Sequence, residues 1–174
     1  MFFKPAYFRH PDYWVGVRDL ASVATGIGAW GLMTGVAMVK SGMSPLEAVA
    51  MTLFVFAGSA QLAAIPLIAA GAPLWVILAT AFCVNLRFVV FSAHLRPYVM
   101  HLPLRERLMT GYLTADLSYV FFAKRYPHAP TETTTKADKL AQQAYLAGNT
   151  GINWVSWMGA SMVGIALANA IPTE

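Results

Sequence analysis

The stretch AVAMTLFVFAGSAQLAAIPLIAA, residues 48–70, contains no charged residue and decides the fold class. A helix that crosses a lipid bilayer needs roughly 20 predominantly apolar residues, so this stretch predicts a transmembrane helix. Gly58 and Pro66 lie inside it. Glycine adds backbone freedom and proline removes an N–H donor, so both weaken a helix. We therefore expect this helix to be broken or kinked at Gly58 and Pro66.

Further apolar stretches lie on both sides of this one, at residues 20–39, 74–95, 108–123 and 141–171. The chain has 174 residues, of which 57% are hydrophobic and only 11% are charged, and its mean hydropathy is +0.55. A soluble domain averages about 25% charged residues, so a soluble fold is excluded. The sequence predicts an all-α polytopic membrane protein with about five transmembrane spans, the second of them broken or kinked. We expect residues 19–174 to form a single transmembrane domain.

The N-terminal segment, residues 1–18, contains three of the basic residues and no apolar core of a cleavable signal peptide. With five spans, this side of the membrane collects most of the lysines and arginines, which favours a cytoplasmic N-terminus. The net charge is +4. Lysines and arginines at the ends of spans account for such a charge, so we expect no nucleic-acid partner.

The sequence Ser44-Pro45-Leu46-Glu47 is typical of a helix start. A serine at the N-cap accepts a hydrogen bond from the third helical amide, and a glutamate at that third position accepts one from the N-cap amide. Proline at the first helical position costs nothing, because its missing N–H would have no partner there. The sequence therefore predicts a helix that begins at Pro45.

Four polar residues lie near the middle of predicted spans: Ser59, Gln61, Asn85 and Arg87. Broken helices expose backbone donors and acceptors at this depth, where transporters bind their substrates. We interpret these four residues as candidates for binding a substrate carboxylate. For any one of them, the alternative is a hydrogen bond between helices, worth about 0.6–2 kcal/mol.

Asp116 lies in the middle of the stretch 108–123, at a depth similar to that of Arg87. Each charge costs roughly 2.5–3.5 kcal/mol at the centre of a membrane helix, so pairing of the two would offset part of that cost. Two interpretations of Asp116 remain open. It either forms an ion pair that locks two helices together, or it carries a proton during transport.

Other chemistry is not indicated. The four histidines have no carboxylate or second histidine at helical spacing, and Cys83 is the only cysteine, so we expect no metal site. No nucleotide-binding loop and no nucleophile–base motif is present, so we expect no cofactor and no enzymatic activity. Trp154 and Trp157 are interpreted as interfacial or packing residues.

Five short motifs occur in order along the chain, and together they resemble the AzlC family, the large subunit of branched-chain amino acid exporters. They are Gly16-Val-Arg-Asp19, Ser44-Pro-Leu-Glu47, Phe56-Ala-Gly-Ser-Ala-Gln61, Gly71-Ala-Pro-Leu-Trp75 and Asn85-Leu-Arg87. Trp154-Val-Ser-Trp157 resembles the tryptophan-containing fifth segment of that family. Two positions depart from the family pattern. Phe88 stands where the family often has histidine, and in Thr114-Ala115-Asp116-Leu117 the acid is shifted by one position and a second acid is missing.

The resemblance implies a multi-pass protein of the bacterial inner membrane that exports leucine, isoleucine or valine by secondary transport. It also implies a small AzlD-like membrane subunit as partner. A typical member is longer at its C-terminus, so the chain looks like the first part of one. The alternative interpretation is therefore a non-transporting scaffold subunit or an inactive fragment of a permease.

Overall fold

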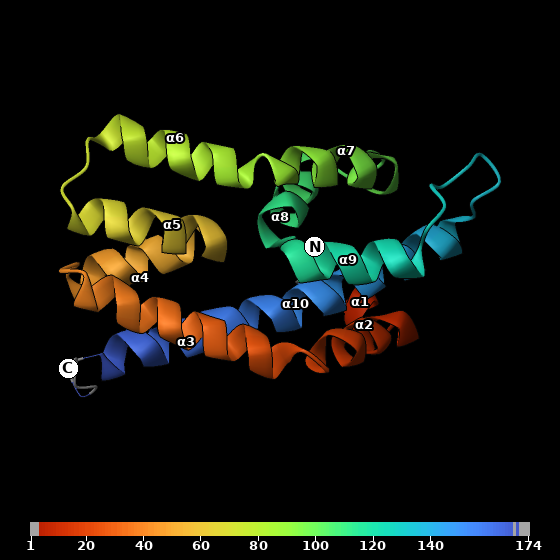
Figure 1. The fold of residues 1–174 in the computed structure, drawn as a ribbon. Coiled ribbons are helices and arrows are strands. Elements are labelled where there is room, and N and C mark those ends of the chain that lie inside the picture. The colour runs from red at the N-terminus through yellow and green to blue at the C-terminus, as the bar shows by residue number, and fades with distance from the viewer. Residues whose placement is uncertain (1–3, 169, 171–174) are drawn as a thin grey trace. The chain divides into compact units, whose positions relative to one another are not determined.

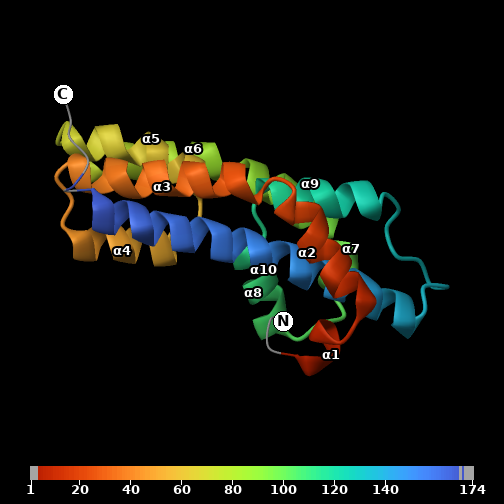
Figure 2. The same cartoon turned by 90° about the horizontal axis from the view of Figure 1, so that it is seen from below.

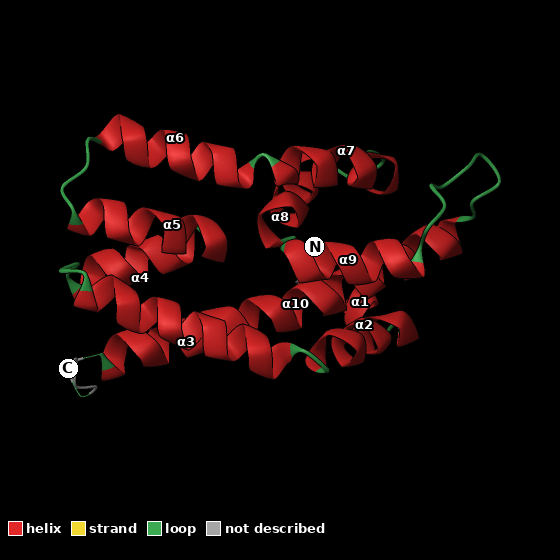
Figure 3. Ribbon diagram, in the orientation of Figure 1, coloured by secondary structure: helices red, strands yellow, loops and turns green. Residues whose placement is uncertain are grey.

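In the computed structural model, residues 4–168 and 170 are described, and every regular element among them is a helix (Figures 1 and 3). The helices are α1 (Pro5–Phe8), α2 (Pro11–Ala21), α3 (Ala24–Lys40), α4 (Pro45–Phe54), α5 (Gly58–Ala69), α6 (Leu74–Asn85), α7 (Arg87–Val99), α8 (Leu104–Leu113), α9 (Asp116–Arg125) and α10 (Lys136–Leu167). The all-α fold is confirmed. The chain forms two compact units, each described by itself: unit 1 comprises residues 1–24 and 90–154, and unit 2 comprises residues 25–89 and 155–174.

The helix start predicted at Pro45 is confirmed. The Ser44 hydroxyl accepts a hydrogen bond from the Glu47 amide at 3.3 Å, and the Glu47 carboxylate accepts one from the Ser44 amide at 2.8 Å. These two bonds satisfy backbone donors that the first turn of a helix leaves without partners. They fix the beginning of α4.

The second apolar segment is broken, as predicted. Helix α4 ends at Phe54 and α5 begins at Gly58. Ala57 has φ −149° and ψ 77°, well outside the helical region, so the chain changes direction there. Pro66 does not break the helix: it lies inside α5, which continues to Ala69, and this expectation is corrected. The break lies at residues 55–57, well before the proline.

The third and fourth apolar segments are also divided, although no glycine or proline at these places predicts a break. Leu86 separates α6 from α7, and Thr114 and Ala115, both extended, separate α8 from α9. The fifth segment is different, because α10 runs without interruption past Gly148 and Gly151. Among the described residues, helix breaks therefore occur at four places in the apolar segments: residues 22–23, 55–57, 86 and 114–115.

Unit 2 contains α4, α5, α6, nearly all of α3 and the C-terminal part of α10. One cluster of its buried core consists of Met38, Ala48, Ile65 and Ile165. Helix α5 packs against α6 (Figure 1). Glycines bring α3 and α10 into backbone contact. A Cβ atom on Gly31 would lie 2.8 Å from the Trp157 carbonyl oxygen, and one on Gly35 would collide with the Ser161 carbonyl. Small residues allow this approach where lipid provides no hydrophobic drive between helices.

Unit 1 contains α1, α2, α8, α9, most of α7 and the first part of α10. Aromatic residues dominate its core: Tyr7, Tyr13, Tyr98, Phe122 and Tyr145. In this unit too, glycines allow α10 to approach a neighbouring helix closely. A Cβ on Gly16 would meet the backbone of Tyr145, and one on Gly148 would meet the backbone of Tyr13, so α2 lies directly against α10 (Figure 2).

A helix that crosses a membrane must be both long and apolar. Among the described residues, no single helix is both long and apolar enough to cross a membrane. Two pairs, α2 with α3 and α6 with α7, meet the requirement of length and composition together, and each pair is bent by more than 40° at its short break.

Candidate functional site

The candidate site in unit 2 is built at the N-terminus of α5. The first backbone bond of this helix runs from the Gln61 amide to the Ala57 carbonyl, at 2.9 Å. The amides of residues 58–60 precede that bond, and no side chain caps the helix start. The first turn of a helix carries partial positive charge, so this end is suited to an anionic group.

Two of the predicted site residues meet here. The guanidinium of Arg87 donates from Nη2 to the Ser59 hydroxyl and from Nη1 to the Val84 carbonyl, the latter at 3.3 Å. Arg87 is the first residue of α7, directly after the break at Leu86. The guanidinium is therefore held beside the first turn of α5 by a contact with that turn's own side chain.

The other two predicted residues supply acceptors. Gln61 is fully buried and donates from Nε2 to the Met51 carbonyl at 3.4 Å, which ties α5 to α4 across the break. Its Oε1 atom is buried and has no hydrogen-bond partner among the described residues. The same is true of Oδ1 of Asn85, the last residue of α6. Buried amide oxygens normally have partners, so these two are suited to accept a hydrogen bond from a bound molecule.

Trp157 was not anticipated at this site. It lies on α10, and a Cβ atom on Gly58 would stand 2.7 Å from Cζ2 of its ring. The ring therefore lies on the first residue of α5, and glycine at position 58 leaves room for it. Two features of the sequence lie at this contact, the tryptophan pair of the fifth segment and the glycine at the break. They are far apart in the chain, so no local pattern predicts that they meet.

Unit 2 contains some groups that suit an anion and others that suit a hydrogen-bond donor. Arg87 and the amides of residues 58–60 suit an anion, and the free oxygens of Gln61 and Asn85 suit a donor such as an ammonium group. An α-amino acid carries both groups. Histidines, cysteines and carboxylates that could hold a metal do not gather in groups of three or more within residues 4–168.

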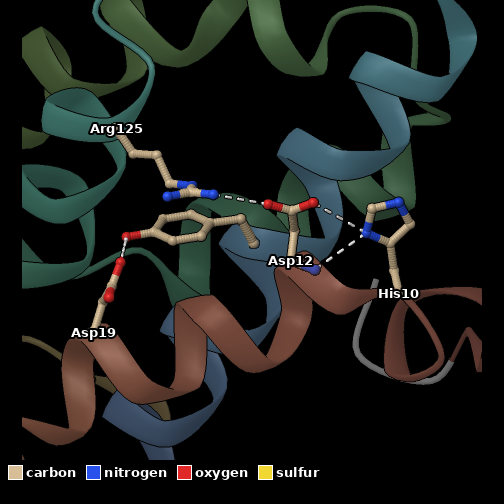
Figure 4. Close-up of polar contacts among 5 residues, drawn as sticks. His10, Asp12, Asp19 and Arg125 are labelled. Carbon is tan, nitrogen blue, oxygen red and sulfur yellow. Dashed lines mark hydrogen bonds and ion pairs between the residues drawn. The ribbon is translucent and has the colours of Figure 1, made fainter.

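A separate polar cluster lies in unit 1, where Figure 4 shows residues of α2 meeting residues of α9 and α10. The Asp12 carboxylate accepts a hydrogen bond from Arg125 at 3.0 Å and lies 3.4 Å from Nδ1 of His10. The guanidinium of Arg125 stands 5.1 Å from the centre of the Tyr145 ring, and Tyr145 donates to Asp19 at 2.8 Å. These contacts tie three helices together.

Asp116 lies in unit 1, as the first residue of α9 and directly after the break at residues 114 and 115. In the same turn the hydroxyl of Ser118 is buried, and Asn149 of α10 donates to the Ser118 carbonyl at 3.5 Å. Asp116 therefore stands at a second helix break lined with buried polar groups. Because Arg87 belongs to unit 2, the ion pair between these two residues remains a prediction.

Apolar helices that are broken at points lined with buried polar side chains are typical of α-helical membrane transport proteins. The family model described as AzlC protein matches residues 22–171. The chain belongs to the AzlC family, a family of membrane transport proteins, as the sequence motifs predicted.

A relative from Escherichia coli (strain K12), "Inner membrane protein YgaZ", is 24% identical over 130 residues. The match covers 75% of this chain and 50% of that protein, so the chain spans about half the length of the relative. No solved structure gives a significant match.

Proposed function

We propose that the chain is a permease subunit that exports small apolar amino acids of the branched-chain type by secondary transport. It works as a multi-pass protein of the bacterial inner membrane, together with a small AzlD-like membrane subunit. Membership of the AzlC family supports the transport role. The contact of Arg87 with Ser59, at the uncapped start of α5, is the observation that carries the substrate assignment.

In this proposal the substrate carboxylate replaces part of the Arg87–Ser59 contact. It accepts hydrogen bonds from the guanidinium and from the first amides of α5, which carry the positive end of the helix dipole. The ammonium group donates to the buried oxygens of Gln61 and Asn85. Both charges of the amino acid then have hydrogen-bond partners of the opposite kind.

Asp116 has the second role in the proposal. Either it pairs with Arg87, or it takes up and releases a proton as the transporter changes state. Acidic groups at membrane depth are costly and are retained mainly where ions or solutes pass.

The test is efflux of preloaded labelled valine from cells that express this chain with an AzlD-like subunit. Arg87→Ala removes a charge-assisted bond worth roughly 1.5–3 kcal/mol, which corresponds to about one to two decades in apparent affinity. Arg87→Lys should restore little, because lysine keeps the charge and loses the planar fork. Arg96→Ala is the matched control, since Arg96 is an exposed arginine in the last turn of the same helix.

Two results would count against the proposal. If Arg87→Ala is inserted normally and exports valine at the wild-type rate, Arg87 is a structural residue and the site is wrong. If the chain exports nothing with its partner while a full-length relative does under the same conditions, the chain is a scaffold subunit or an inactive fragment.

A further inference from the structure

The indole nitrogen of Trp157 is an unused donor inside unit 2. Only 8% of the residue is exposed, and Nε1 is buried with no hydrogen-bond partner in the described part of the chain. An indole N–H can donate but cannot accept, and buried tryptophans usually find an acceptor. A donor left without one in this position needs an explanation.

The place of the ring supplies one. It lies on Gly58, the first residue of α5, where the amides of residues 58–60 precede the first helical bond. Arg87 reaches the same turn through Ser59. Three kinds of donor, an indole N–H, a guanidinium and the helix amides, therefore gather at one helix start. An anionic group is the acceptor that suits all three kinds of donor.

We propose that Trp157 determines the specificity of the site by donating its indole N–H to the carboxylate of the bound amino acid. This inference rests on the proposed function. It narrows the substrate class to solutes with a free carboxylate, because an amide or an ester in its place accepts more weakly and carries no charge. The ring also lies on the first residue of α5, beside the amides that we expect to bind the carboxylate.

If Trp157 serves only in packing, a different result is expected. Packing against Gly58 uses the outer atoms of the indole, and the shorter phenylalanine side chain does not reach them. A packing role therefore predicts a lower thermal midpoint for the phenylalanine variant, whereas a donor role predicts a higher KM. Trp157→Phe keeps an aromatic ring and removes the donor. Trp154→Phe is the matched control, because Trp154 lies on the same helix and its Nε1 already donates to the Tyr112 hydroxyl at 3.3 Å.

The experiment measures efflux of labelled valine against internal valine concentration, with valinamide and valine as competitors, for the wild type and both variants. Purified proteins are checked for an unchanged thermal midpoint. For Trp157→Phe we expect KM to rise about ten-fold with little change in the maximal rate, as for loss of one bond to a charged group. The preference for valine over valinamide should fall by a similar factor, and Trp154→Phe should match the wild type.

The outcomes separate the two proposals. If the wild type exports valine and Trp157→Phe keeps its KM and its preference over valinamide, Trp157 is a packing residue and the inference is overturned, while the proposed function stands. Equal losses in both tryptophan variants, or a fall in maximal rate alone, overturn it in the same way. If the wild type exports no valine with its partner subunit, the proposed function itself fails and the inference fails with it.

Discussion

The guanidinium of Arg87 donates to the hydroxyl of Ser59, a residue 28 positions earlier in the chain. Each of the two follows a break in an apolar segment, since Ser59 is the second residue of α5 and Arg87 is the first residue of α7. The bond therefore joins two interrupted helices at their interruptions. A charged side chain inside an apolar protein is stable only where such partners are present.

Ser59 should affect binding more than stability. In Ser59→Ala the guanidinium loses the contact that holds it beside the first turn of α5, and we expect the apparent affinity for valine to fall by about 1 kcal/mol, less than for Arg87→Ala. Ser161→Ala is the matched control in the same unit, because its hydroxyl donates to the Gly31 carbonyl at 3.1 Å, away from α5. It should lower the thermal midpoint and leave KM unchanged. Equal effects of the two serines on KM would contradict the site.

Gly58 should tolerate no side chain. An alanine Cβ would stand 2.7 Å from Cζ2 of Trp157, so the ring must shift, and overpacking of this kind costs about 1–3 kcal/mol. At Gly159, an exposed glycine of α10, a Cβ meets nothing within 4 Å. Gly159→Ala should therefore stabilise the helix by roughly 0.5–1 kcal/mol. Thermal unfolding of the purified variants in detergent measures both. A Gly58→Ala protein as stable as Gly159→Ala would show that the ring does not lie on Gly58.

Glu47 should make the start of α4 sensitive to acid. Hydrogen bonds from the hydroxyl and amide of Ser44 lower the pKa of this carboxyl group below its ordinary value of 4.5. A lowered folded-state pKa means that the stabilisation is present above pH 4.5 and is lost as the pH falls through the folded value.

The measurement is the thermal midpoint between about pH 3 and pH 6, for the wild type and Glu47→Gln. Glutamine can still accept from the Ser44 amide but does not titrate. The midpoint of the wild type should fall more steeply in acid than that of the variant. Identical pH profiles would show that the carboxylate does not stabilise the helix start.

The parts of the fold that the sequence predicted correctly are those with local causes. The helix start at Pro45 follows from Ser44 and Glu47, and the break before Gly58 follows from a glycine in an apolar helix. Pro66 shows the limit of this reasoning, because a proline removes one donor and the helix on both sides of it still forms.

The breaks at Leu86 and at Thr114–Ala115 carry no glycine or proline, so no local preference revealed them. Tertiary contacts decide such positions, as they do the contact of Trp157 with Gly58. Of the candidate site, the sequence predicted the polar residues from their depth in the spans, and the structure brings Ser59 and Arg87 together. The donor on Trp157 could not be inferred, because it becomes significant only when the ring is seen to lie on α5.

The predicted ion pair between Arg87 and Asp116 can be tested by a double-mutant cycle. Arg87→Gln and Asp116→Asn each remove one charge, and stranding the other charge at membrane depth should cost about 3–5 kcal/mol. The double variant leaves no unpaired charge, so it should be destabilised far less than the sum of the two single variants. Unfolding of the purified proteins in detergent gives the coupling energy. If the destabilisation of the double variant equals the sum of the two single variants, Arg87 and Asp116 form no ion pair. Asp116 would then be left with its other proposed role, and valine efflux by Asp116→Asn should lose its dependence on an imposed pH gradient.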